Sequence, residues 1–138
     1  GTVYDADSDS CVVIQDSRLT PEENYDAVRE LAYAGRYADA QLVLSKMDQS
    51  DDAVQTYWGG THRKLGNTDQ AMAAYYTALA TNPDNHLARS YMGQHYAEIG
   101  ATEAARVQLI EIHLRGGGDT WAAQSLESAI KLGRGPSY

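Results

Sequence analysis

The hydrophobic positions along the chain follow a helical pattern that is present in three copies. Each copy has a glycine, an alanine five residues later and a large apolar residue four residues after the alanine. The three copies are Gly35, Ala40 and Leu44; Gly66, Ala71 and Tyr75; and Gly100, Ala105 and Leu109. The glycines lie 31 and 34 residues apart, and a period of ~34 residues is the length of a repeating helix-turn-helix unit. The pattern therefore predicts a tandem array of helical hairpins.

Each position of this pattern has a physical role. Glycine ends a helix because it adopts the left-handed backbone conformation without steric cost. Alanine is small enough to let two helices cross closely. The large residue one turn later fills the space beside the crossing. The three copies therefore predict three turns, each followed by a close helix crossing.

Capping signals mark where the predicted helices begin and end. Thr20, Pro21 and Glu23 form a capping box with proline at the first helical position. Acidic, amide and hydroxyl residues begin later helices at 51–52, at 67–68 and at 119–120. The three glycines of 116–118 end the helix before them. The predicted helices are 21–34, 37–48, 52–65, 68–81, 84–99, 102–115 and 121–132.

These helices predict an all-α fold of three helical hairpins, over residues 21–51, 52–85 and 86–118. The helix within 119–132 is expected to cover the end of the array, because the last unit would otherwise expose an apolar face. Trp121, Leu126 and Ile130 are expected to lie on the third hairpin, with Glu127 and Lys131 facing water. Residues 1–19 are interpreted as a non-helical extended or hairpin segment, and 133–138 as a loose tail.

Two of the hairpins carry a specific family resemblance. The residues concerned are Tyr57, Trp58, Gly59, Leu65, Gly66, Ala71, Tyr75, Ala78, Leu79 and Pro83, then Met92, Gly93, Tyr96, Gly100, Ala105, Leu109 and Ile112. On these residues, the chain resembles the tetratricopeptide repeat family over about 21–118. The first hairpin matches less fully, because it is three residues short and lacks the closing proline. The resemblance implies a right-handed superhelix with a concave groove that binds proteins, and it does not name the partner.

The segment before the helices resembles part of a Cys-bounded hairpin in small exported tetratricopeptide proteins of proteobacteria. The matching residues are Thr2 to Asp5 and Cys11 with Val12. The resemblance implies that Cys11, the single cysteine, pairs with a cysteine that would precede Gly1. It also implies a periplasmic or secreted location. A cytoplasmic location, with Cys11 as a free thiol, is the alternative.

Composition and charge narrow the classes of partner. The formal net charge of −8 argues against nucleic-acid binding, which needs clustered Lys and Arg for phosphate contacts, and against an anionic membrane surface. The sequence contains no run of ~18 apolar residues, the length that a helix needs to cross a bilayer. The chain has ten tyrosines and no phenylalanine, and tyrosine favours grooves and surfaces where its hydroxyl finds a partner. A protein or peptide partner fits this composition.

The family geometry places the first helix of each hairpin along the concave groove. The residues expected to point into it are Tyr25, Arg29 and Tyr33; Thr56, Tyr57, Gly60, Arg63 and Lys64; and Leu87, Ser90, Tyr91, Gln94 and Glu98. This surface combines tyrosines with a cationic spot at Arg29, Arg63 and Lys64, and Tyr and Arg are common interface anchors. A peptide with an aromatic or apolar anchor and an acidic group would suit it. Packing of some tyrosines between helices, with solvated charges, is the alternative for each residue.

Catalytic and metal-binding patterns are weak. Asp5, Asp7, Asp9 and Asp16 have the spacing of a calcium loop, but the turn glycine is missing and the closing residue is not Glu. An acidic turn before a short strand at 11–14 is the alternative. His95 and Glu98 lie one turn apart, and two ligands do not make a metal site. No nucleophile-base arrangement or phosphate loop is present, so we expect neither an enzyme nor a bound cofactor or metal.

Three functional hypotheses follow from the sequence. The first is a protein-binding scaffold or adaptor that uses the concave Tyr and Arg surface. The second is a structural protein that associates with itself, as a homodimer for example, because short solenoids expose apolar ends. The third is an enzyme or metal protein built on His95 and Glu98 or on the loop from Asp5 to Asp16. The absence of a catalytic pattern favours the first.

Overall fold

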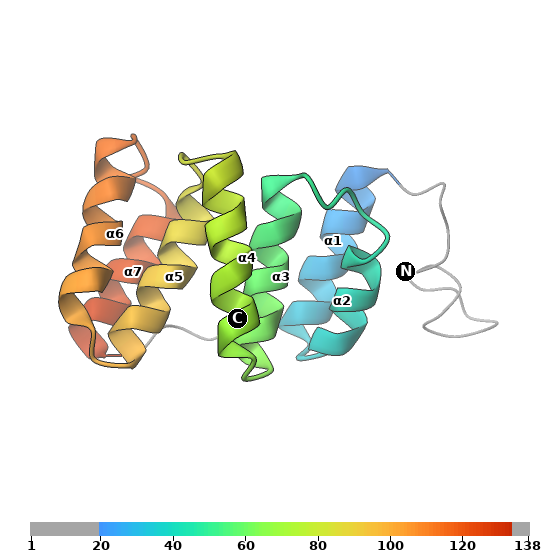
Figure 1. The fold of residues 1–138 in the computed structure, drawn as a ribbon, viewed down its shortest axis with the longest axis horizontal. Coiled ribbons are helices and arrows are strands. Elements are labelled where there is room, and N and C mark those ends of the chain that lie inside the picture. Colours follow the sequence, from blue (N-terminus) through green and yellow to red (C-terminus); the bar gives the residue numbers. More distant parts are fainter. Residues whose placement is uncertain (1–19, 134–138) are drawn as a thin grey trace.

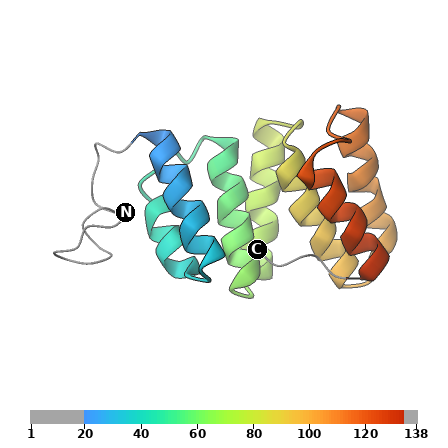
Figure 2. The ribbon, with the colours of Figure 1, turned by 180° about the vertical axis from the view of Figure 1, so that it is seen from behind.

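The computed structural model describes residues 20–133, and within them the chain forms seven α-helices and no strand. Their bounds are α1 Pro21–Tyr33, α2 Tyr37–Leu44, α3 Asp52–Lys64, α4 Thr68–Thr81, α5 His86–Glu98, α6 Thr102–Leu114 and α7 Trp121–Leu132. Figure 1 looks onto α2, α4 and α6, and Figure 2 looks from behind onto α1, α3 and α7. The predicted all-α helical repeat is confirmed. None of the described helices is long and apolar enough to cross a membrane.

The predicted glycine turns share one hydrogen-bond pattern. Gly35 has a φ of 78°, and the next N–H, on Arg36, donates to the carbonyl of Leu31 at 2.8 Å. This left-handed glycine with a six-to-one bond is a Schellman motif, which satisfies a carbonyl that the helix end leaves without a partner. Gly66, Gly100 and Gly116 repeat the motif, with φ of 84°, 82° and 87° and the same bond length. The turns that set the repeat length are thus alike.

The small residues sit where helices cross, as the pattern predicted. Ala40 and Ala105 are fully buried and Ala71 is 2% exposed. Tyr75 is fully buried against Gly59, where a Cβ atom on the glycine would lie 2.4 Å from the tyrosine ring. Glycine at position 59 is therefore required by the crossing of α3 and α4. These contacts hold α3 and α4 at a fixed distance, and α3 presents Tyr57 to the pocket face.

Two predicted helix boundaries are wrong. The helix predicted to reach residue 48 ends at Leu44. Beyond it, the N–H groups of Lys46 and Met47 donate to carbonyls three residues back instead of four, and the Gln49 side-chain amide donates to the Leu44 carbonyl at 2.8 Å. The helix predicted from residue 84 begins at His86. Asn85 has an extended backbone and caps that helix by accepting from the Ala88 N–H. Side-chain hydrogen bonds to the backbone thus set both the end of α2 and the start of α5.

The last helix, α7, packs against α5 and α6. Leu126 is fully buried over Gly93, where an added Cβ would lie 2.7 Å from a leucine methyl. Ser125 lies beside Ser90 and Gln94, at 3.2 and 3.3 Å between the polar atoms. The predicted cover over the third hairpin is present, but one of its expected members, Trp121, is 52% exposed.

Several predictions lie outside the described residues. They concern the hairpin or strand around Cys11, the calcium-loop spacing of Asp5 to Asp16, and the tail beyond Gly133.

Candidate functional site

A pocket of about 310 Å³ opens on the face made by α1, α3, α5 and α7, the side seen in Figure 2. Its walls are mostly aromatic, so we call it the aromatic pocket. The lining residues are Arg29, Ala32, Tyr33, Tyr57, Leu87, Tyr91 and Trp121. Four helices far apart in sequence thus contribute to one hollow. Of the residues predicted for the groove, Arg29, Tyr33, Tyr57, Leu87 and Tyr91 lie in it.

The charged wall of the pocket is Arg29. Its Nη1 donates to the Tyr57 hydroxyl at 3.1 Å, and its Nη2 lies 2.5 Å from the Asp26 carboxylate. The bond to Tyr57 raises the pKa of Arg29 above its ordinary value, although burial acts in the opposite direction. The Arg29 side chain remains 43% exposed. It can therefore meet a carboxylate while Tyr57 holds it in place.

Tyr25 lies beside the pocket. Its ring is tilted against that of Tyr57 with centroids 6.0 Å apart, and its hydroxyl bonds to the carboxylate of Asp51. The pKa of Tyr25 is raised, chiefly by burial and to a smaller extent by this hydrogen bond. Asp51 also caps α3 by accepting from Ala53 at 2.9 Å. Tyr25 thus joins the starts of α1 and α3 and supports the ring of Tyr57.

The opposite wall is built by Tyr91 and Trp121. Tyr91 is only 5% exposed, and its ring packs at 6.2 Å from the rings of both Tyr75 and Trp121. The contact with Trp121 is edge-on, with an interplanar angle of 75°, an arrangement favoured by aromatic quadrupoles. The sequence reasoning missed Trp121 because it assigned this residue to the cover of the third hairpin.

The predicted cationic spot is not one site, because Arg29 lines the pocket and Arg63 and Lys64 do not. Arg63 on α3 pairs with both carboxylate oxygens of Glu98 on α5, at 3.0 and 3.1 Å, and its side chain is only 11% exposed. Burial and the neighbouring Arg63 lower the pKa of Lys64. None of these three side chains lines the aromatic pocket. Among the described residues, Arg29 is therefore the single charged one that lines the pocket.

Four residues predicted to face the groove are instead buried between helices: Thr56, Gly60, Ser90 and Gln94. Thr56 donates to the Asp52 carbonyl and accepts from the Asn85 side chain, both at 2.8 Å. Gln94 donates to Ser90 at 2.9 Å. These four positions are therefore not open to a partner, and Ser90 and Gln94 lie against Ser125 of α7.

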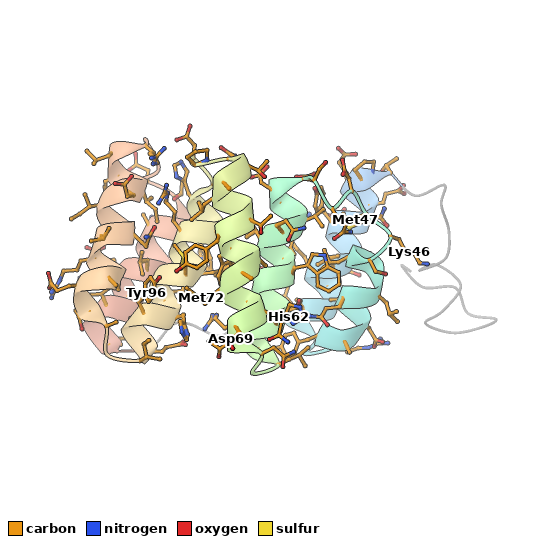
Figure 3. The ribbon with its side chains drawn as sticks, viewed as in Figure 1. Lys46, Met47, His62, Asp69, Met72 and Tyr96 are labelled. Atoms are coloured by element: carbon orange, nitrogen blue, oxygen red, sulfur yellow. The ribbon has the colours of Figure 1, made fainter. Side chains whose placement is uncertain are left out.

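A second, shallower hollow of about 320 Å³ lies on the other side of the array. Its lining includes Trp58 and His62, and Figure 3 labels His62 on this side. The Trp58 indole already donates to Gln49 at 2.8 Å and stacks on His62 at 5.7 Å. In the described part of the chain, no side chain with a fixed charge lines this hollow. This hollow therefore offers fewer anchoring groups than the aromatic pocket.

His95 lies against the ring of Tyr96, at 6.2 Å between centroids. Within residues 20–133, no three histidine, cysteine or acidic side chains gather as metal ligands would. His62 is half-buried, and burial lowers its pKa.

Comparison with known proteins gives one match. A family model described as tetratricopeptide repeat matches residues 62–130, which is half of the 138-residue chain. The matched segment runs from the end of α3 into α7. Neither the curated proteins nor the solved structures gave a match.

Proposed function

Since this chain belongs to the tetratricopeptide repeat family, we propose that it binds a segment of another protein in the aromatic pocket. Repeats of this family generally act as protein-interaction scaffolds. The observation that carries the proposal is the convergence of Arg29, Tyr57, Tyr91 and Trp121, from four helices, on one hollow. Trp, Tyr and Arg are the residues that most often carry binding energy at protein interfaces.

The pocket suits a particular kind of segment. Its walls can enclose an apolar or aromatic side chain, whose burial provides the driving force. Arg29 can pair with a carboxylate near that side chain, because its guanidinium is partly exposed and held by Tyr57. A hydrogen bond between a guanidinium and a carboxylate is stronger than one between neutral groups, and the partner's carboxylate would share Arg29 with the exposed carboxylate of Asp26. The proposed partner therefore carries an apolar anchor next to an acidic residue or a chain terminus.

A capture experiment tests this proposal. The native chain and the double variant Arg29→Glu/Tyr57→Ala are used as baits in lysate of the source cell, with quantitative mass spectrometry as the readout. The matched control is Arg36→Glu/Tyr76→Ala, which makes the same changes outside the pocket, where Arg36 pairs with Asp39 and Tyr76 is 55% exposed. All baits are checked for helix content.

We expect the native and control baits to retain one protein and the pocket variant to lose it at least ~10-fold, as removal of interface anchors does. Equal capture by the pocket variant would show that binding, if any, occurs elsewhere.

Self-association is a second candidate, supported by a different surface. Val107, Ile110 and Leu114 on α6 are 52%, 55% and 76% exposed. Their spacing of three and four residues places them along one side of the helix. Two copies of such a face can pair about a two-fold axis.

The variant Ile110→Lys/Leu114→Glu would then sediment as a monomer at a concentration of ~100 μM, where the native chain forms a dimer; such concentrations reveal weak association. A native chain that is monomeric under these conditions rules this candidate out.

A further inference from the structure

We propose that Trp121 is a partner-binding residue, so that α7 is a wall of the binding site as well as the cover of the array. The inference rests on the proposed function and adds to it the residue that selects the partner's apolar side chain. Three observations carry it: the exposure of Trp121, the way in which α7 is held, and the position of the indole in the pocket.

Trp121 is not needed to cover the third hairpin. The apolar contacts beneath α7 are made by Ala123, Leu126 and Ala129, which are at most 3% exposed, with Ile130 packed beside them. Trp121 belongs to neither of these clusters. A tryptophan left 52% exposed retains much apolar surface that a partner can remove from water. The ring is therefore available for binding without loss of the core.

The indole is nevertheless held in a defined place. Trp121 is the first residue of α7, and Thr120 caps that helix by accepting from Ala123 at 3.3 Å and donating to the Gly117 carbonyl at 2.6 Å. Further along, Leu126 is seated at Gly93. A side chain on an anchored helix loses little freedom when a partner binds, which favours affinity.

The indole completes a pocket of suitable size. Tyr91 lies edge-on to it at 6.2 Å, and Tyr33 and Tyr57 contribute rings from α1 and α3. A volume of about 310 Å³ is at the small end of the roughly 300–1,000 Å³ of ligand sites. The hollow thus accommodates one or two side chains of an extended segment. Because Arg29 is the charged residue of the lining within residues 20–133, an aromatic or branched aliphatic side chain beside a carboxylate is the complementary ligand.

A phage-displayed library of random dodecapeptides tests the inference with ligands whose sequences are read directly. Peptides are selected on the native chain and synthesised with a fluorescent label. Their affinities are then measured for Trp121→Ala, for Arg29→Glu/Tyr57→Ala and for Leu132→Ala. Leu132 is the matched control, because it is an exposed apolar residue at the other end of α7, 67% exposed. Trp121→Gln serves as a second variant, and circular dichroism verifies that each variant keeps its helices.

We expect selected peptides to combine an apolar residue with Asp or Glu, and to bind Leu132→Ala as they bind the native chain. Their affinity for Trp121→Ala and Trp121→Gln should fall ~30-fold, the loss typical of a tryptophan anchor. If the peptides bind both Trp121 variants normally but fail on Arg29→Glu/Tyr57→Ala, the inference is overturned and the proposed function stands. If no peptide is selected, or if all variants bind alike, both are overturned.

Fluorescence gives an independent readout. The chain has two tryptophans, so Trp58→Phe leaves Trp121 as the single tryptophan. Saturating peptide should shift its emission to shorter wavelength as the indole leaves water. An emission spectrum that does not change with peptide bound contradicts a contact at Trp121.

Discussion

Replacing Gly59 by alanine is expected to destabilise the protein by about 3 kcal/mol, as overpacking of a filled core does. An added Cβ would lie 2.4, 2.6 and 2.9 Å from three ring atoms of Tyr75. That ring is fully buried, so it can move away only by displacing its neighbours. Helix propensity alone would give the opposite sign, since alanine favours a helix interior by about 1 kcal/mol over glycine. The sign of the effect therefore distinguishes the packing contact from propensity.

Urea denaturation of the native chain and Gly59→Ala measures this change in the free energy of unfolding. The double variant Gly59→Ala/Tyr75→Leu relieves the contact and should lose less stability than the two single changes added together. A Gly59→Ala variant that is as stable as the native chain would mean that α3 and α4 cross at a greater distance.

Replacing Leu126 by alanine is expected to destabilise the protein by about 3 kcal/mol, within the range for buried leucine. Leu126 is fully buried where α7 meets α5 and α6. The loss would weaken the attachment of α7 and so the wall that carries Trp121. Hydrogen exchange should show the amides of α7 opening more readily than those of α3 and α4.

Gly93 supplies the matched test of this contact. Gly93→Ala alone places a Cβ 2.7 Å from a Leu126 methyl group and should also destabilise. In Gly93→Ala/Leu126→Ala, the new methyl group partly occupies the space that the leucine vacates. The double variant should therefore be more stable than the sum of the single effects. Strict additivity would indicate that Leu126 and Gly93 do not share one packing site.

The sequence reasoning was strongest for the repeat itself. Left-handed glycines and close-packed alanines depend on local backbone geometry and on residue size, which a spacing pattern records directly. Gly35 and Ala40 illustrate this, because the first is at a φ of 78° and the second is fully buried. The family match over 62–130 agrees with the same pattern. The repeat is irregular at the end of α2, where a side-chain hydrogen bond from Gln49 sets the helix boundary. The spacing pattern does not predict such a bond.

The candidate site was predicted less well, for reasons that lie in its tertiary contacts. The ion pair of Arg63 with Glu98 joins residues 35 positions apart, and no spacing rule connects them. Gln94 faces α7, whose place on α5 could not be derived from the first two hairpins. Trp121 could have been found, because at 100° per residue it lies about 140° from Leu126 around the helix. It therefore falls outside the buried face of α7.

The most direct test of the central claim is an NMR titration of the isotope-labelled chain with a library-selected peptide. Binding in the aromatic pocket predicts that the largest shift changes occur at the amides of Arg29, Tyr57 and Tyr91 and at the indole N–H of Trp121. The indole N–H of Trp58, on the other side of the array, should change little. Shift changes confined to α2, α4 and α6 would contradict the account.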